Sequence, residues 1–321
     1  MRSLVATLIA IPLFGCAASL QRPVVTTEAA TDLTQITSSR GNEIDPTVSP
    51  DGKAIAYAVA AAADARSRVE VASLANPKNV LYASNDVLGR DPTWMPDSSG
   101  IVFVSKLTPT APEKLVQTFG QNEHRPVFLA DVGNPNFVAV RPAVSQSGKV
   151  AMSMAGVGVR NPGWPTTKTL DHGIGVTDLG GHGMDVIGSG TDPAWSPDGK
   201  TIAFAQQSGG HEHLFVANAD GSNRRQVTDG TADDEEPSWS PDGKRIVFCS
   251  AHGTDEWTQA NLFVVRPDGS GLVQLTEGDH LACHPTWARD GYVYFHANVS
   301  DHFHIWRIRV RLPDDSSGAT S

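Results

Sequence analysis

Six polar residues, each directly before a proline, are the first candidates for chemistry in this sequence. They follow one another at intervals of 46, 50, 51, 44 and 48 residues: Asp45, Asp91, Arg141, Asp192, Glu236 and His284. If the fold gathers them, four carboxylates, a guanidinium and an imidazole would suit a cation site or a docking funnel for a basic peptide. Asp233, Asp234 and Glu235 add negative charge beside Glu236. The alternative is structural, because Asp before Pro often begins a turn and accepts a backbone hydrogen bond.

Histidines are the second group, since imidazole and carboxylate are ligands for zinc, manganese and iron. The eleven histidines include two H-x-H pairs, at 211/213 and at 302/304. Residues two apart on a strand share a face, so each pair could chelate one ion. The candidate ligands of a divalent metal are therefore His211, His213, His252, His296, His302 and His304. Because H-x-H is a short motif, histidines that face a partner are the other interpretation.

Two of the three cysteines, Cys249 and Cys283, lie well inside the sequence. In an oxidising compartment they could form a disulfide. Two buried free thiols are the other possibility, and the sequence leaves both open.

Composition narrows the classes of partner and reaction. The 321 residues carry a net charge of −10, which argues against a nucleic-acid partner because phosphate binding needs a basic surface. The sequence contains no G-x-S-x-G nucleophile motif, no phosphate-binding P-loop and no dinucleotide fingerprint. These features favour a role other than catalysis.

Each of the six prolines opens a copy of a longer motif, best seen in "DPAWSPDGKTIAFA" from Asp192 and "EPSWSPDGKRIVFC" from Glu236. The "P-x-W-S" run predicts a short strand, and "S-P-D-G" predicts a turn with glycine where φ is positive. Alternating large apolar residues then predict a second strand. A third strand ends in an Asp-Gly hairpin signal, as in "HLFVANADG", and a fourth follows, as in "RRQVTDG".

Six units with a period in the forties predict an all-β fold, a six-bladed β-propeller with four-stranded antiparallel blades over residues 32–310. The sixth unit offers only three strands, the last being "HIWRIRV" at 304–310. The stretch "DLTQITS" at 32–38 matches the fourth strands of other units, so the N-terminal strand should close the last blade. Four tryptophans recur at one position and should pack between blades: Trp94, Trp195, Trp239 and Trp287.

The order of strands A to D places the D-to-A and B-to-C connections on one face, the top. Ten of the eleven histidines map to this face, His182 being the exception. The six residues before the prolines begin the innermost strands, so we expect them to ring the mouth of the central channel.

The repeat "P-x-W-S-P-D-G-x-x-I-A-F" is similar to the WD40-like (PD40) repeats of the TolB family of propellers, and "VANADGSNRRQVTDG" looks like a TolB blade ending. The resemblance covers roughly residues 32–310. It implies a propeller in the bacterial periplasm. TolB proteins also carry an α/β domain before the propeller, which we do not expect in this chain.

The N-terminal sequence indicates a targeting segment. "MRSLVATLIAIPLFGC" has one basic residue and then an apolar run too short to span a bilayer, which predicts a signal peptide over residues 1–15. "LFGC" resembles the bacterial lipobox, which implies lipidation of Cys16 and sorting to the outer membrane; a plain signal peptide with a chance cysteine is the alternative. Residues 16–31 should form the lipidated N-terminus and a tether, and 311–321 a disordered tail.

These observations lead to two functional hypotheses. The first is a monomeric, lipid-anchored periplasmic propeller that binds a protein or peptide of the cell envelope through its top face and acidic channel mouth, without catalysis. The second is a metal-dependent propeller enzyme, such as a lyase acting on an acidic oligosaccharide, in which Arg141 would hold a substrate carboxylate. Oligogalacturonate lyase, a propeller that holds its metal with histidines, is the analogy for the second.

Overall fold

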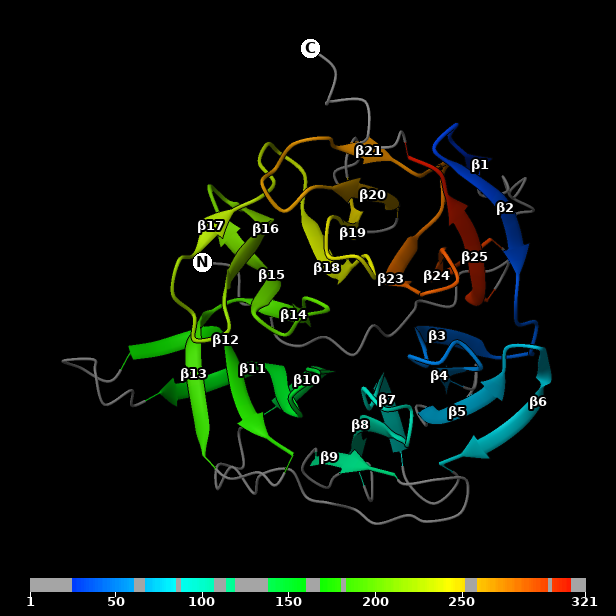
Figure 1. The fold of residues 1–321 in the computed structure, drawn as a ribbon, viewed down its shortest axis with the longest axis horizontal. Coiled ribbons are helices and arrows are strands. Elements are labelled where there is room, and N and C mark those ends of the chain that lie inside the picture. Colours follow the sequence, from blue (N-terminus) through cyan, green and yellow to red (C-terminus); the bar gives the residue numbers. More distant parts are fainter. Residues whose placement is uncertain are drawn as a thin grey trace, which may run out of the picture.

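The computed structural model describes residues 25–60, 67–84, 88–106, 114–118, 138–159, 168–179, 183–251, 259–299 and 302–312. In these ranges the regular elements are β-strands, arranged as radial sheets around a central channel (Figure 1). No helix in this part of the chain is long and apolar enough to cross a membrane.

The sheets form six antiparallel blades, numbered from the first proline motif. The strands of each blade are given from the innermost outward. Blade 1 consists of β3 (Asn42–Val48), β4 (Ala54–Ala60), β5 (Ser67–Ser73) and β6 (Asn76–Ala83), and blade 2 of β7 (Leu88–Trp94), β8 (Ile101–Lys106) and β9 (Lys114–Gln117). Blade 3 consists of β10 (Val138–Val144), β11 (Lys149–Val159), β12 (Lys168–Asp178) and β13 (Met184–Ser189), and blade 4 of β14 (Thr191–Trp195), β15 (Thr201–Ser208), β16 (His211–Asn218) and β17 (Arg225–Gln226). Blade 5 consists of β18 (Asp234–Trp239), β19 (Ile246–Ser250), β20 (Asn261–Val265) and β21 (Val273–Gln274), and blade 6 of β23 (Ala282–Trp287), β24 (Tyr292–Ala297), β25 (His304–Val310) and β2 (Ala30–Gln35). The fourth strand expected in blade 2 falls outside the described residues. The six-bladed architecture is as predicted.

The N-terminal strand closes the ring, which confirms the prediction from "DLTQITS". β2 pairs with β25 in antiparallel register, from Ala30 opposite Val310 to Gln35 opposite Trp306. The residues before β2 also pair with the C-terminal half of the chain. β1 (Val25–Thr26) pairs with β22 (Thr276–Glu277), which directly follows the last strand of blade 5 in the sequence. Within the described residues, strand pairing therefore starts at Val25, inside the segment 16–31 that we predicted to be the lipidated N-terminus and a tether.

The recurring tryptophans join neighbouring blades, as predicted. The indole N–H of Trp94 donates to the Thr47 carbonyl of blade 1 at 3.0 Å. Trp195 and Trp239 repeat this bond, to Ala143 and Ala194 of the preceding blades. Each of these three indoles therefore contributes buried area and one interblade hydrogen bond.

The "S-P-D-G" turns hold the innermost two strands of a blade together. Ser196 donates to the Asp198 carboxylate at 2.7 Å, and Ser240 donates to Asp242 at the same distance. Gly199 and Gly243 take φ of 69° and 72°, a region that glycine enters without steric cost. These turns lie at the ends of strands A opposite the channel mouth.

Candidate functional site

The innermost strand of every blade is interrupted at the residue before its proline. The register with the second strand shifts at each of these positions, for example between Thr191 and Ala194. All six residues adopt a left-handed backbone: Asp45 (φ 54°), Asp91 (49°), Arg141 (51°), Asp192 (54°), Glu236 (59°) and His284 (53°). This conformation costs a non-glycine residue about 1–3 kcal/mol, so its repetition six times needs a compensating arrangement.

The bulges turn the six side chains toward one another. All six residues line the same central cavity of about 350 Å³, together with the prolines that follow them. Proline has no N–H to donate, which would break an uninterrupted ladder of hydrogen bonds. It is tolerated here because the ladder is already interrupted at the bulge and the innermost strand is an edge of its sheet. We expected these six residues to begin the innermost strands. They lie instead inside the strands, at the second to the fourth residue.

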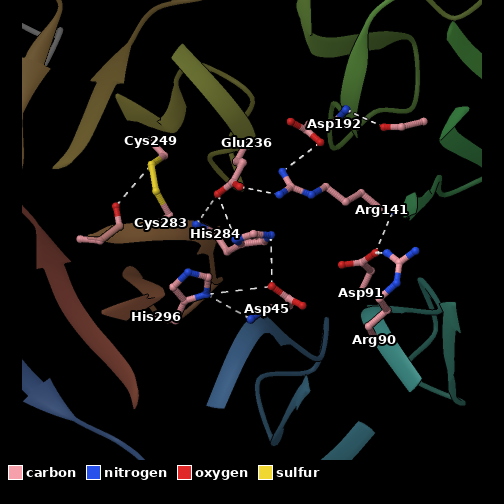
Figure 2. Close-up of polar contacts among 12 residues, drawn as sticks. Asp45, Arg90, Asp91, Arg141, Asp192, Glu236, Cys249, Cys283, His284 and His296 are labelled. Carbon is pink, nitrogen blue, oxygen red and sulfur yellow. Dashed lines mark hydrogen bonds and ion pairs between the residues drawn. A yellow bond between two sulfur atoms is a disulfide. The ribbon is translucent and has the colours of Figure 1, made fainter. Parts of the chain in front are cut away.

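A chain of ion pairs crosses the channel mouth (Figure 2). Arg141 reaches Asp192 Oδ1 at 2.9 Å and Glu236 Oε1 at 2.6 Å, and so spans from blade 3 to blades 4 and 5. His284 continues the chain, with Nδ1 3.0 Å from Glu236 Oε2 and Nε2 3.1 Å from Asp45 Oδ1. Asp91 joins through its contact with Arg90 and by accepting the Arg141 backbone N–H at 3.3 Å.

Side chains of neighbouring blades satisfy backbone N–H groups at the bulges. His284 N–H donates to Glu236 Oε2 at 2.7 Å, and Asp192 N–H donates to Ser153 Oγ at 2.8 Å. Asp45 N–H donates to Nδ1 of His296 at 3.2 Å. Because an unpaired buried amide is costly, these bonds stabilise the left-handed backbone that aims the side chains inward.

One position of the second strand supplies several of these contacts. Ser153, Cys249 and His296 each lie opposite the residue that precedes a bulge residue, in blades 3, 5 and 6. From this position each side chain reaches the next blade. The sequence analysis named His296 as a candidate metal ligand, and aligning the six repeats on this column would also have placed it at the mouth.

Cys249 and Cys283 form a disulfide in the structure, between β19 and β23. Their Cα atoms are 5.1 Å apart and both side chains are buried. The bond joins blades 5 and 6 directly behind the mouth, one residue before His284 (Figure 2).

Burial and neighbouring charges set the protonation of the mouth. Burial raises the pKa of Asp45 to about 6, although His284 opposes the shift. Burial would also raise the pKa of Glu236, but Arg141 and His284 hold it well below its usual range. Burial lowers the pKa of His284, yet the Glu236 and Asp45 carboxylates together outweigh it and the net shift is upward. Burial and then His284 place the pKa of His296 well below its usual range, which keeps that ring neutral.

A second group of acids lies beside the mouth, between blades 4 and 5. Burial, and then Asp192 and Asp233, raise the pKa of Glu212 to about 7. Burial, and then Asp192 and Glu236, raise the pKa of Glu235 well above its usual range. We call Glu212, Asp233 and Glu235 the outer acids.

The H-x-H histidines do not converge on one point. His211 faces Asp233 at 3.3 Å and His213 faces Asp234 at 3.8 Å, with ring centroids 6.4 Å apart. His304 contacts Glu43 at 2.9 Å across the boundary from blade 6 to blade 1. His252 lies outside the described residues, as do His124 and His182.

Among the described residues, two groups place three ligand atoms within 4.8 Å of one another, and His211, His213, His302 and His304 belong to neither. One group consists of Asp45, His284 and His296. The other includes the two disulfide cysteines, whose sulfurs are already bonded to each other. The first group is therefore the candidate for holding a metal.

Two histidine–carboxylate pairs were missed by the sequence analysis. His213–Asp234 and His304–Glu43 occupy equivalent places, since each acid lies two residues before a mouth residue. Each pair is buried at a blade boundary. Only the alignment of the repeats could have suggested them.

Comparison with known proteins agrees with this fold. Residues 182–314 match the family described as TolB beta propeller domain. TolB from Acinetobacter baumannii has 18% sequence identity and a TM-score of 0.60, with 79% of this chain and 59% of that chain covered. This chain thus spans less than two thirds of that relative's length. No curated protein matches the sequence.

Enzymes are found among the structural relatives too. An oligogalacturonate lyase in complex with manganese has 14% identity and a TM-score of 0.55, over 92% of this chain and 98% of that one. A gluconolactonase from Xanthomonas campestris has 14% identity and a TM-score of 0.60, over 92% and 100% of the two chains. Likeness at this identity shows the fold alone. The chain is a six-bladed β-propeller, and its residues 182–314 match the TolB beta propeller domain.

Proposed function

We propose that this protein is a lipid-anchored, periplasmic, non-catalytic binding module that docks a basic segment of an envelope protein or peptide at its channel mouth. The anchor would be Cys16, and the propeller would act as a monomer. The observation that carries the proposal is the set of six strained bulges, which direct charged side chains from six blades toward one opening.

The balance of charge supports a cationic partner. The ring contains four carboxyl groups against Arg141 and His284, with Arg90 paired to Asp91, and the outer acids add three more carboxyl groups beside it. Within the described residues, no ion pair joins Glu212 or Glu235 to a lysine or arginine. A lysine or arginine from a partner would relieve the repulsion that raises the pKa of these two acids.

Charge reversal of two outer acids tests the docking site. The variant Glu212→Lys/Glu235→Lys should weaken binding of a fluorescent lysine-rich decapeptide by at least about tenfold, measured by anisotropy at low salt. The control Asp185→Lys/Glu277→Lys makes the same change in net charge on exposed strands away from the mouth and should bind nearly as well as the parent. Equal losses in the two variants would show that only net charge matters, and would exclude this docking site.

The pH dependence of stability follows from Glu212. Its pKa is about 7 in the folded state, against 4.5 for an ordinary glutamate, so folding favours the protonated form. The stabilisation is complete below pH 4.5 and is lost as pH rises through 7. Allowing for solvent around the half-buried side chain, this amounts to about 1 kcal/mol, or ~2–4 °C in Tm.

Thermal melts at pH 5 and pH 8 measure this effect. Glu212→Gln should show a smaller fall in Tm between the two values than the parent does. The carboxyls of Asp192 and Asp233 and the ring of His211 face the same region, so some dependence will remain. An unchanged fall in Tm in the Gln variant would contradict the assignment.

A second candidate function is a metal-dependent enzyme, for example a lyase on an acidic oligosaccharide. The grouping of Asp45, His284 and His296 favours it, as does Arg141 nearby as a carboxylate-binding group. Arg141 already contacts two carboxylates, however, so a substrate carboxylate would have to displace one of them. We therefore place docking first.

A further inference from the structure

We propose that Asp45, His284 and His296 form a binding site for a divalent transition metal ion at the channel mouth. One ligand atom from each lies within 4.8 Å of the others. The ligands come from β3, β23 and β24, so the ion would bridge blade 6 to blade 1 at the inner ends of the two sheets (Figure 2). The inference is independent of the proposed docking function.

The spacing of the donor atoms suits an ion with bonds near 2 Å. Two ligands on tetrahedral zinc, at bond lengths of about 2.1 Å, are about 3.4 Å apart. Here His284 Nε2 and Asp45 Oδ1 are 3.1 Å apart, and His296 Nδ1 is 4.0 Å from the same oxygen. Small side-chain movements would therefore bring all three into coordination.

Glu236 prepares His284 for this role. Its Oε2 lies 3.0 Å from Nδ1 of His284, and Nε2 of the same ring lies 3.1 Å from Asp45 Oδ1. A carboxylate behind a metal-binding histidine is the usual outer partner that fixes the ring and its tautomer. A metal ion would lie between His284 Nε2 and Asp45 Oδ1, which now form an ion pair at 3.1 Å.

The third ligand changes partner when the ion binds. His296 Nδ1 accepts the Asp45 backbone N–H at 3.2 Å, and a metal would take that lone pair instead. Asp45 and His296 are buried, whereas the His284 side chain is 21% exposed. The ring nitrogens of His284 are buried as well, so the remaining coordination positions would lie inside the mouth.

Two histidines and one carboxylate define the class of ion. Imidazole suits zinc, iron, copper and nickel, whereas calcium and magnesium prefer all-oxygen sites. Three protein ligands with an open position are also typical of zinc sites that bind an exchangeable ligand. We expect zinc, the probe used below, to bind with one ion per chain.

Calorimetry with zinc chloride on the tag-free full chain tests the site, and cobalt substitution reports the ligand set through its visible absorption. His296→Gln, whose amide oxygen can still accept the Asp45 N–H, and Asp45→Asn should each weaken zinc binding by at least about 100-fold. The control His211→Gln/His213→Gln should keep the affinity and the cobalt spectrum of the parent. Thermal melts of the metal-free proteins verify that the variants fold.

Three results would each overturn the proposal. The first is a parent protein that takes up no zinc at about 100 µM free ion. The others are a cobalt spectrum without nitrogen ligation and a loss of binding only in the 211/213 control. If a variant melts early, the stoichiometry and cobalt spectrum of the parent still decide. Metal uptake is read without peptide, so its failure leaves the docking site standing. Failure of peptide docking likewise leaves the metal site standing.

Discussion

Deletion of residues 25–38 is expected to open the ring and abolish cooperative folding, or to lower Tm by at least about 10 °C. The deletion removes β2, which pairs with β25 along its length, and the backbone bond from Arg311 N–H to the Ala29 carbonyl at 2.8 Å. It also removes Leu33, which packs on the cluster between blades 5 and 6, and Ile36, which packs on the cluster between blades 6 and 1. Burial of two or three such side chains contributes about 5 kcal/mol, a large share of the stability of a typical domain.

A matched control and a rescue make this prediction specific. A variant that lacks only residues 1–24 keeps every described strand and should melt like the full chain in detergent-free buffer. Because β2 runs antiparallel to β25, residues 28–38 can be moved behind Leu312 through a short glycine-containing hairpin. This permuted chain should recover most of the lost Tm. A deletion variant that melts within a few degrees of the parent as a monomer would show that closure contributes little.

The fold could be predicted because its signals are local and repeated. The turn "S-P-D-G" and the alternating strand after it act within about 14 residues, and six copies reveal the ring. Closure was also predictable, because "DLTQITS" is an ordinary fourth strand in an unusual place. The pairing of β1 with β22 was not, since residues 25–26 carry no pattern and their partner lies 250 residues away.

The members of the mouth were predictable, but their pairing was not. A charged residue before a proline in an innermost strand must lie at a bulge, so the repeat alone nominates all six. That Arg141 crosses to Glu236 depends on side-chain length and on the diameter of the ring, which no local pattern encodes. The H-x-H rule misled for a related reason. Residues two apart do share a face of β16, but that face meets separate acids of blade 5.

Replacement of Glu236 by leucine is expected to destabilise the protein by about 3–5 kcal/mol, although leucine is apolar and the site is buried. Glu236 contacts Arg141 at 2.6 Å and His284 at 3.0 Å, and it accepts the His284 backbone N–H at 2.7 Å. Its removal takes one of two carboxylate partners from Arg141 and from His284, and it leaves the His284 backbone N–H without its acceptor. Thermal melts should show Tm lower by roughly 10 °C.

A double-mutant cycle separates the broken ion pair from other effects of the substitution. If the cost comes from the stranded charge, Arg141→Met/Glu236→Leu should lose less than the sum of the single variants, by at least about 1 kcal/mol. Glu236→Gln, which can still accept the His284 N–H, should fall between leucine and the parent. Strict additivity would mean that Arg141 and Glu236 do not stabilise each other, and that the strained bulges are held by the disulfide and the interblade hydrogen bonds instead. Coupling would instead show that the ring of charges offsets the conformational cost of the six left-handed residues. A partner that docks at the mouth would then have to leave these ion pairs intact.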